Sequence, residues 1–422
     1  MLQHFWLTFE FFGKNGLANH AAASAYGFLL SAAPILLVIS FLVSIILFRS
    51  PELAEYMSEQ IGFFSDFLNA GNFFRDFLDT DNPGFAGFIS VIPIFWAARL
   101  CALSMQRGLG VIFPGKKSGP RKTSPFRGTA VTLGMGFLII LFIFVMLVGS
   151  RLVLDFLDSM DFALARSLRS IVLVFPDRAL YLAGLFLMTL VSFRFVPVNR
   201  QEWKYIIPGA LTCIVFYMFF TLGFSFIINP DRYNLLYGAL GSLFLFLLNV
   251  YFFFYFYLFG AQFTMVQAAS DALLFIRFRQ HHTRKSPVKP WEKLFASPPW
   301  PLQSYIKEYK AGDLVFVRGS QSQDAYYILS GKAGVYLDDE CQNRIALIEE
   351  KHFFGELEFV SSEGRTASIK AETDLSVIVL SRALFRNIMQ IDPDTDRSII
   401  QGLSERLKSS NKRELLDEGR NS

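Results

Sequence analysis

Two long stretches of this chain carry no charged side chain. Residues 15–48 and residues 233–270 contain no Asp, Glu, Lys or Arg. A helix of about 20 apolar residues crosses the hydrocarbon core of a bilayer, so each stretch is long enough to span a membrane. Charged residues make up 18% of the 422 positions, against roughly 25% in soluble domains. The sequence therefore predicts that much of the chain lies in a membrane.

Four further apolar segments lie between these two stretches. Three of them are long enough to span a bilayer, namely residues 84–105, 128–150 and 205–228. The remaining segment, residues 179–193, is apolar but short, and a helix reaching back to about residue 170 would include Asp177 and Arg178. We therefore predict a polytopic α-helical membrane bundle with six spans, which occupies residues 1–273.

The charges between the spans predict their orientation. The loop 49–83 is acidic, whereas the loops after the second, fourth and sixth spans are basic. The loop after the second span alone carries Arg107, Lys116, Lys117, Arg121, Lys122 and Arg127. Because basic loops stay on the cytoplasmic side, this alternation predicts that the N- and C-termini are both cytoplasmic.

A few polar residues lie within the predicted spans. Arg99, Asn249 and Gln262 are candidates for a transport pathway, because polar groups within a membrane often mark one. Arg99 lies in the cytoplasmic half of its span, so its side chain could instead reach the headgroups. Asn249 and Gln262 could instead bridge neighbouring helices.

Three motifs in this region resemble those of one family. "AAASAYGFLLSAAPILLVIS" (21–40), "FRFVPVNRQEWKYIIPGAL" (193–211) and "LLYGALGSLFLFLLNVYFFFYFYLFGAQF" (235–263) are similar to the YihY/BrkB family of bacterial inner-membrane proteins. The resemblance covers about residues 5–270 and implies a multi-pass inner-membrane protein. It further implies transport of an unknown solute; members once carried the label ribonuclease BN, which was later abandoned. The usual Gly-Ala-Glu of the last span reads Gly260-Ala261-Gln262 here.

The composition changes after the last span. Residues 274–303 are basic and contain several prolines, which predicts a linker. From residue 304 onward, short alternating runs are broken by Gly312, Gly319 and Gly331, which predicts consecutive strands with turns. We expect residues 304–422 to form a small β jelly-roll barrel with flanking helices, the last two at 381–390 and 394–417.

The stretch "FFGELEFVSSEGRTASIKA" (353–371) is similar to the phosphate-binding cassette of the cyclic nucleotide-binding domain. The resemblance covers about residues 304–417 and implies cAMP or cGMP as the ligand, with no further cofactor. It implies that Arg365 binds the phosphate and that Glu356 accepts a hydrogen bond from the ribose 2′-hydroxyl. The implied site residues are Gly355, Glu356, Leu357, Arg365, Thr366 and Ala367.

The cassette departs from the family pattern at two positions. Lys351 stands where the family often has a glycine, and Glu358 replaces a small residue. One alternative is therefore a degenerate barrel that has lost its ligand and serves docking or oligomerisation. A homo-oligomer could form through apolar residues of the last helix, which include Ile399, Leu403 and Leu407.

Other classes of protein fit less well. An ion channel with a voltage sensor is disfavoured, because the fourth span has no arginine repeat and no TVGYG-like filter occurs. An enzyme is disfavoured, because the five histidines are scattered and no nucleophile motif accompanies them. The three cysteines form no metal-binding motif, and we expect neither a metal nor a nucleic-acid partner.

Overall fold

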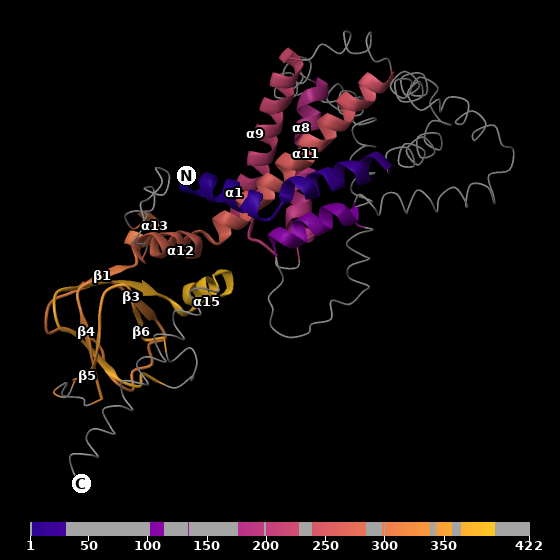
Figure 1. The fold of residues 1–422 in the computed structure, drawn as a ribbon. Helices are drawn as coiled ribbons and strands as arrows, with labels where there is room; N and C mark the ends of the chain where they lie inside the picture. Colours follow the sequence, from indigo (N-terminus) through magenta and orange to yellow (C-terminus); the bar gives the residue numbers. More distant parts are fainter. Residues whose placement is uncertain are drawn as a thin grey trace, which may run out of the picture. The chain divides into compact units, whose positions relative to one another are not determined.

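The structure, a computed structural model, describes residues 2–30, 102–113, 134, 176–197, 200–227, 239–283, 298, 300–337, 342, 344–356 and 364–392. The chain divides into two compact units (Figure 1), the first unit Met1–Ala268 and the second unit Ala269–Ser422. The expected boundary lay at residues 273 and 274, so five residues assigned to the bundle belong to the second unit.

The first unit is helical throughout its described elements. Two of the six predicted spans, the fifth and the sixth, correspond to helices that are long and apolar enough to cross a membrane. The fourth is a helix whose apolar part, Tyr181–Phe195, is shorter. The first is helical over residues 17–30, and most of the second and third lies outside the described residues. The elements are α1 (Leu2–Lys14), α8 (Pro176–Phe195), α9 (Trp203–Ile227) and α11 (Ala239–Ala268).

Helices α9 and α11 cross at two glycines. A Cβ atom on Gly260 would lie 2.5 Å from the carbonyl oxygen of Gly209, and one on Gly209 would lie 2.7 Å from the carbonyl oxygen of Gly260. No side chain larger than hydrogen fits there, so the two backbones are in direct contact. Small residues at helix crossings are typical of membrane proteins, in which close packing replaces the hydrophobic effect between helices.

One face of α9 is apolar and exposed. Its residues recur at helical spacing, and they are Trp203, Ile207, Leu211, Phe219, Leu222 and Phe226. The side chain of Phe226 is 89% exposed and that of Phe219 is 63% exposed. A soluble core helix would bury such residues, whereas a bilayer solvates them. The face fits contact with lipid. Helix α1 packs on α11 through rings such as Phe5 and Phe263, whose centroids are 4.8 Å apart.

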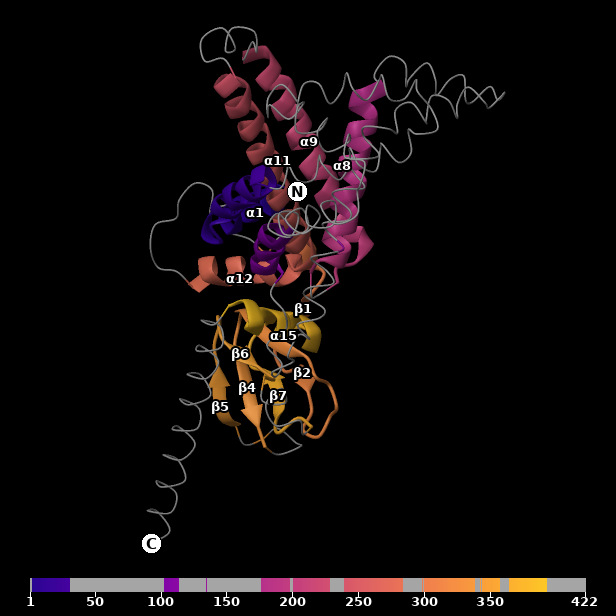
Figure 2. The same cartoon turned by 90° about the vertical axis from the view of Figure 1, so that its right-hand side faces the viewer.

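The second unit contains two antiparallel four-stranded sheets, in the orders β1-β8-β3-β6 and β2-β7-β4-β5 (Figure 2). The predicted barrel of consecutive strands is confirmed. Gly312, Gly319 and Gly331 have φ angles of 96°, 79° and 93°, so the predicted turns need glycine. The strands are β1 (Ile306–Tyr309), β2 (Leu314–Phe316), β3 (Ala325–Ser330), β4 (Ala333–Tyr336), β5 (Arg344–Ile348), β6 (Phe353–Phe354), β7 (Ser368–Ala371) and β8 (Leu375–Leu380).

In the part of the second unit that the structure describes, three helices flank this barrel: α12 (Ser270–Thr283), α13 (Trp300–Gln303) and α15 (Arg382–Ile391). Helix α15 agrees with the prediction for residues 381–390. It begins after Ser381, whose hydroxyl accepts a hydrogen bond from the amide of Leu384. The helix predicted at 394–417 lies outside the described residues, as does most of the loop between α12 and α13.

The linker prediction is corrected over residues 274–283. This segment belongs to α12, and Leu274 and Phe275 are both 0% exposed. The basic residues suggested an extended, solvated segment, yet Arg279 is buried and paired with an acidic residue far along the chain. Burial of the apolar side chains then stabilises the helix as part of the second unit.

Candidate functional site

The cassette, residues 355–367, begins where β6 ends. Gly355 follows Phe354 with a φ angle of 73°, which is a left-handed backbone that favours glycine. A Cβ atom at this position would also lie 2.5 Å from Nη1 of Arg365. Both the positive φ angle and the lack of space for a Cβ atom therefore favour glycine at position 355. The close approach of Gly355 and Arg365 brings the two ends of the cassette together.

Arg365 is the central residue of the site and is 2% exposed. Its Nη1 donates to the carbonyl oxygen of Gly355 at 3.0 Å, and its Nη2 donates to that of Asp324 at 2.6 Å. The guanidinium lies 4.0 Å from the ring centroid of Phe316. Hydrogen bonds from a charged group and a cation–π contact together offset the unfavourable desolvation of this cation.

The backbone of Arg365 is fixed by the turn after β2. The amide of Arg365 donates to the carbonyl oxygen of Ser320 at 3.1 Å, and the amide of Gly319 donates to that of Arg365 at 2.8 Å. These two hydrogen bonds fix the backbone of Arg365, from which the guanidinium extends into the barrel. Thr366, the next residue, is exposed, and Ala367 is half-buried.

Glu356 follows Gly355 and is 2% exposed. A carboxylate so deeply buried is unfavourable unless charge or hydrogen bonding compensates for it. Two oppositely charged residues, Glu356 and Arg365, are thus buried within one short loop system. Leu357 and Glu358 lie outside the described residues.

Lys351 has a φ angle of 70°. This is the position where the related cassettes often have a glycine, and the backbone conformation explains the preference. Two hydrogen bonds hold the turn against β3: the amide of Lys351 donates to the carbonyl oxygen of Ile328, and the amide of Ile328 donates to that of His352. These bonds hold the left-handed backbone of Lys351 in place although the residue is not a glycine.

The sequence did not indicate the residues that hold Arg365. Asp324 acts through its carbonyl oxygen, which any residue could supply. Phe316 contacts the guanidinium at the end of β2, where the pairing of β2 with β7 shifts register between Leu314 and Phe316. An irregularity of this kind has no sequence signature. Tyr326 also lies beneath the arginine, with its centroid 5.7 Å from the guanidinium, and burial raises the pKa of its hydroxyl.

Asn249 and Gln262, two of the three candidate transport residues, make hydrogen bonds at separate places in the first unit. The hydroxyl of Tyr217 donates to Oδ1 of Asn249 at 2.6 Å, whereas Nδ2 of Asn15 donates to Oε1 of Gln262 at 3.1 Å. The two residues lie 13 positions apart on α11, which is about 20 Å along a helix. Each makes a hydrogen bond to a different segment of the first unit. Arg99 lies outside the described residues.

The fold and the site define a helical, membrane-associated protein that carries a cyclic nucleotide-binding domain. Residues 306–392 match the sequence model of the cyclic nucleotide-binding domain. Residues 8–276, more than half of the chain, match the model described as "Virulence factor BrkB". The chain belongs to the BrkB family, and the resemblance expected from its motifs is confirmed.

Individual relatives cover only part of the chain. A Rhodopseudomonas palustris protein named "Putative potassium channel protein RPA4233" is 30% identical over 95 residues, which are 22% of this chain and 23% of that protein. The Pasteurella multocida "cAMP-activated global transcriptional regulator CRP" is 26% identical over 111 residues, which are 26% of this chain and 53% of that regulator. The chain thus spans between about a quarter and about half of the length of these relatives. A crystal structure of a cyclic nucleotide-binding domain from Methylobacillus flagellatus is 18% identical, with a TM-score of 0.26, and covers 35% of this chain and 85% of its own.

Proposed function

We propose that this protein is an inner-membrane transporter whose activity is regulated by cyclic AMP bound to its second unit. The observation that carries the proposal is the buried Arg365, whose guanidinium donates to the carbonyl oxygen of Gly355, the residue directly before the buried Glu356. A guanidinium presents paired donors that match two oxygens of a phosphate. A purely structural barrel has no need to bury this charge.

Cyclic AMP is the first ligand to test, because the curated relatives include regulators named as cAMP-activated. Cyclic GMP is the second. Thr366 is exposed directly after Arg365, so its hydroxyl is open to a guanine amine as well. The choice between the two nucleotides is therefore part of the experiment.

Transport by the first unit is the less direct part of the proposal. It is supported by membership of the BrkB family and by two helices apolar enough to span a membrane. We further propose the inner membrane, cytoplasmic termini and a role other than catalysis. The relative named as a channel matches over 22% of this chain, a length close to that of the barrel, and lends little support to a channel.

Calorimetric titration of the full chain in lipid nanodiscs with cAMP and with cGMP tests the ligand. We expect saturable binding of one nucleotide, which Arg365→Ala reduces at least about 100-fold, since it removes a charge-assisted contact to the phosphate. Arg386→Ala is the matched control, because this arginine is exposed on α15. If the folded chain binds neither nucleotide, the barrel is a docking or assembly module and the proposal fails.

A further inference from the structure

Helix α12 connects the two units in the chain. Ala269 is the only residue between the end of α11 and the start of α12. Half of the residues of α12 are buried, and among them Phe275, Phe278 and Arg279 are between 0% and 9% exposed. Contacts that hold α12 against the barrel therefore also fix the segment that follows α11, the last apolar helix, directly in the chain.

The β3–β6 pair lies between the cassette and α12. Tyr326 pairs with Phe354, and Tyr327 pairs with Phe353. Successive side chains of a strand point to opposite faces, so the two pairs face in opposite directions. Tyr326 and Phe354 stack at 4.9 Å in the barrel core beneath Arg365. The strands β3 and β6 thus carry Tyr326 and Phe354 on the face toward Arg365, and Tyr327 and Phe353 on the face away from it.

That opposite face is covered by α12 and α15. The ring of Phe275 in α12 lies 5.4 Å from that of Tyr327 and 6.1 Å from that of Phe353. Phe385 in α15 contacts Phe353 at 6.0 Å. Phe353 thus contacts both helices, and it stands two residues before Gly355, whose carbonyl oxygen accepts a hydrogen bond from Arg365.

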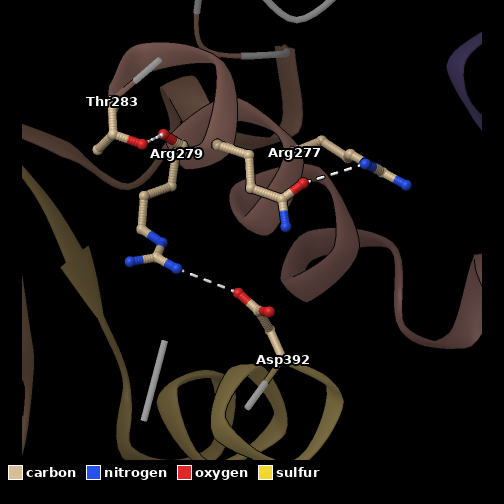
Figure 3. Close-up of polar contacts among 5 residues, drawn as sticks. Arg277, Arg279, Thr283 and Asp392 are labelled. Carbon is tan, nitrogen blue, oxygen red and sulfur yellow. Dashed lines mark hydrogen bonds and ion pairs between the residues drawn. The ribbon is translucent and has the colours of Figure 1, made fainter. Parts of the chain in front are cut away.

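An ion pair joins the two helices over this cluster (Figure 3). Nη2 of Arg279 in α12 lies 3.1 Å from Oδ2 of Asp392 at the end of α15, and both side chains are 10% exposed. The guanidinium also lies 6.0 Å from the ring centroid of Phe353. Asp392 is the C-cap of α15, where the helix dipole disfavours a negative charge. A cation from another element therefore favours the negative charge of Asp392 at this position, and Arg279 supplies one.

We propose that Arg279 and Asp392 are positioning residues for the nucleotide site, and that they couple nucleotide binding to α12 through Phe353. This inference rests on the proposed nucleotide binding. The ion pair stabilises the arrangement in which Arg365 donates to Gly355 and Asp324. A phosphate competes for the same donors, so the ion pair opposes nucleotide binding. Because coupling is reciprocal, nucleotide binding in turn weakens the ion pair between Arg279 of α12 and Asp392 at the end of α15.

The test compares two arginines of the same helix. Figure 3 shows that Arg279 reaches Asp392. Nη1 of Arg277 instead donates a hydrogen bond to Oε1 of Gln280 within α12. Full chain in nanodiscs is titrated with cAMP as wild type, Arg279→Gln and Arg277→Gln. We expect Arg279→Gln to tighten the Kd at least about fivefold, the lower end of typical allosteric coupling, and Arg277→Gln to change it less than about twofold.

Two further variants separate coupling from general damage to the fold. Asp392→Asn should tighten the Kd like Arg279→Gln, and the double variant should show no further gain, because both remove the same interaction. The exchanged pair Arg279→Asp with Asp392→Arg should restore the wild-type Kd. An unchanged or weakened Kd in both single variants overturns the inference. Absence of cAMP binding in the wild type overturns the proposed function instead.

Discussion

The two units bury different kinds of polar group. Among the described residues, the buried polar side chains of the first unit are all uncharged: Thr8, Ser24, Thr189, Ser192, Gln262 and Thr264. The four buried charged residues, Arg279, Glu356, Arg365 and Asp392, all lie in the second unit. Hydrogen bonds between neutral groups are enough to hold packed helices together. Buried charges are unfavourable unless an opposite charge or hydrogen bonds compensate for them. The comparison associates the first unit with packing and the second with sensing a charged ligand.

The largest effect on stability is expected at the buried ion pair. Asp392→Ala should lower the free energy of unfolding of the second unit by about 3–5 kcal/mol, because it removes the carboxylate that lies 3.1 Å from the buried guanidinium of Arg279. Hydrogen exchange of the β8 amides measures this loss. The exposed pair between Lys332 and Glu349 is the matched control, and Glu349→Ala should leave the stability nearly unchanged, because solvent screens this pair. Equal effects of the two variants would contradict the contrast between buried and exposed charge.

The next effect is expected at the helix crossing of the first unit. Gly260→Ala places a methyl group 2.5 Å from the carbonyl oxygen of Gly209, and backbone cannot move aside as a flexible side chain could. We expect a loss of about 1–3 kcal/mol from overpacking, seen as a lower apparent Tm in nanodiscs. Gly223→Ala in α9 is the control, because its Cβ would meet nothing within 4 Å. A Gly260→Ala protein as stable as wild type would refute direct backbone contact.

A single neutral hydrogen bond in the first unit should matter less. Tyr217→Phe removes the hydroxyl that donates to Asn249 and contacts the hydroxyl of Tyr181 at 3.2 Å. Such bonds between membrane helices contribute about 0.6 kcal/mol on average, so the apparent Tm should fall by only a few degrees. If Tyr217→Phe instead abolished transport without lowering the Tm, this polar cluster would belong to the solute pathway.

The smallest effect concerns pH and His282. Burial lowers the pKa of this imidazole below its ordinary value of 6.5, and the nearby Lys351 lowers it further. The unfolded chain therefore binds a proton more readily, so this contribution to stability is full above about pH 6.5 and is lost as the pH falls below it. His282→Gln should reduce the difference in Tm between pH 7.5 and pH 5.5. An unaltered difference would exclude His282 as its source.

Local patterns predicted the barrel well, because strands and turns depend on nearby residues. The glycines at 312, 319 and 331 and the spacing from Gly355 to Arg365 were readable directly from the sequence. The burial of Arg279 was not readable, because its partner Asp392 lies 113 residues away and both looked like surface charges. In the first unit, the Gly209–Gly260 crossing depends on which helices meet, and hydrophobicity alone does not specify this.

The central claim is that the second unit senses a cyclic nucleotide and acts on the membrane helices. Hydrogen–deuterium exchange of the full chain in nanodiscs, with and without saturating cAMP, tests it most directly. We predict slower exchange in the cassette, residues 355–367, together with altered exchange in α12 and the adjoining end of α11. Changes confined to the barrel would contradict regulation of the first unit, and no change anywhere would contradict nucleotide sensing itself.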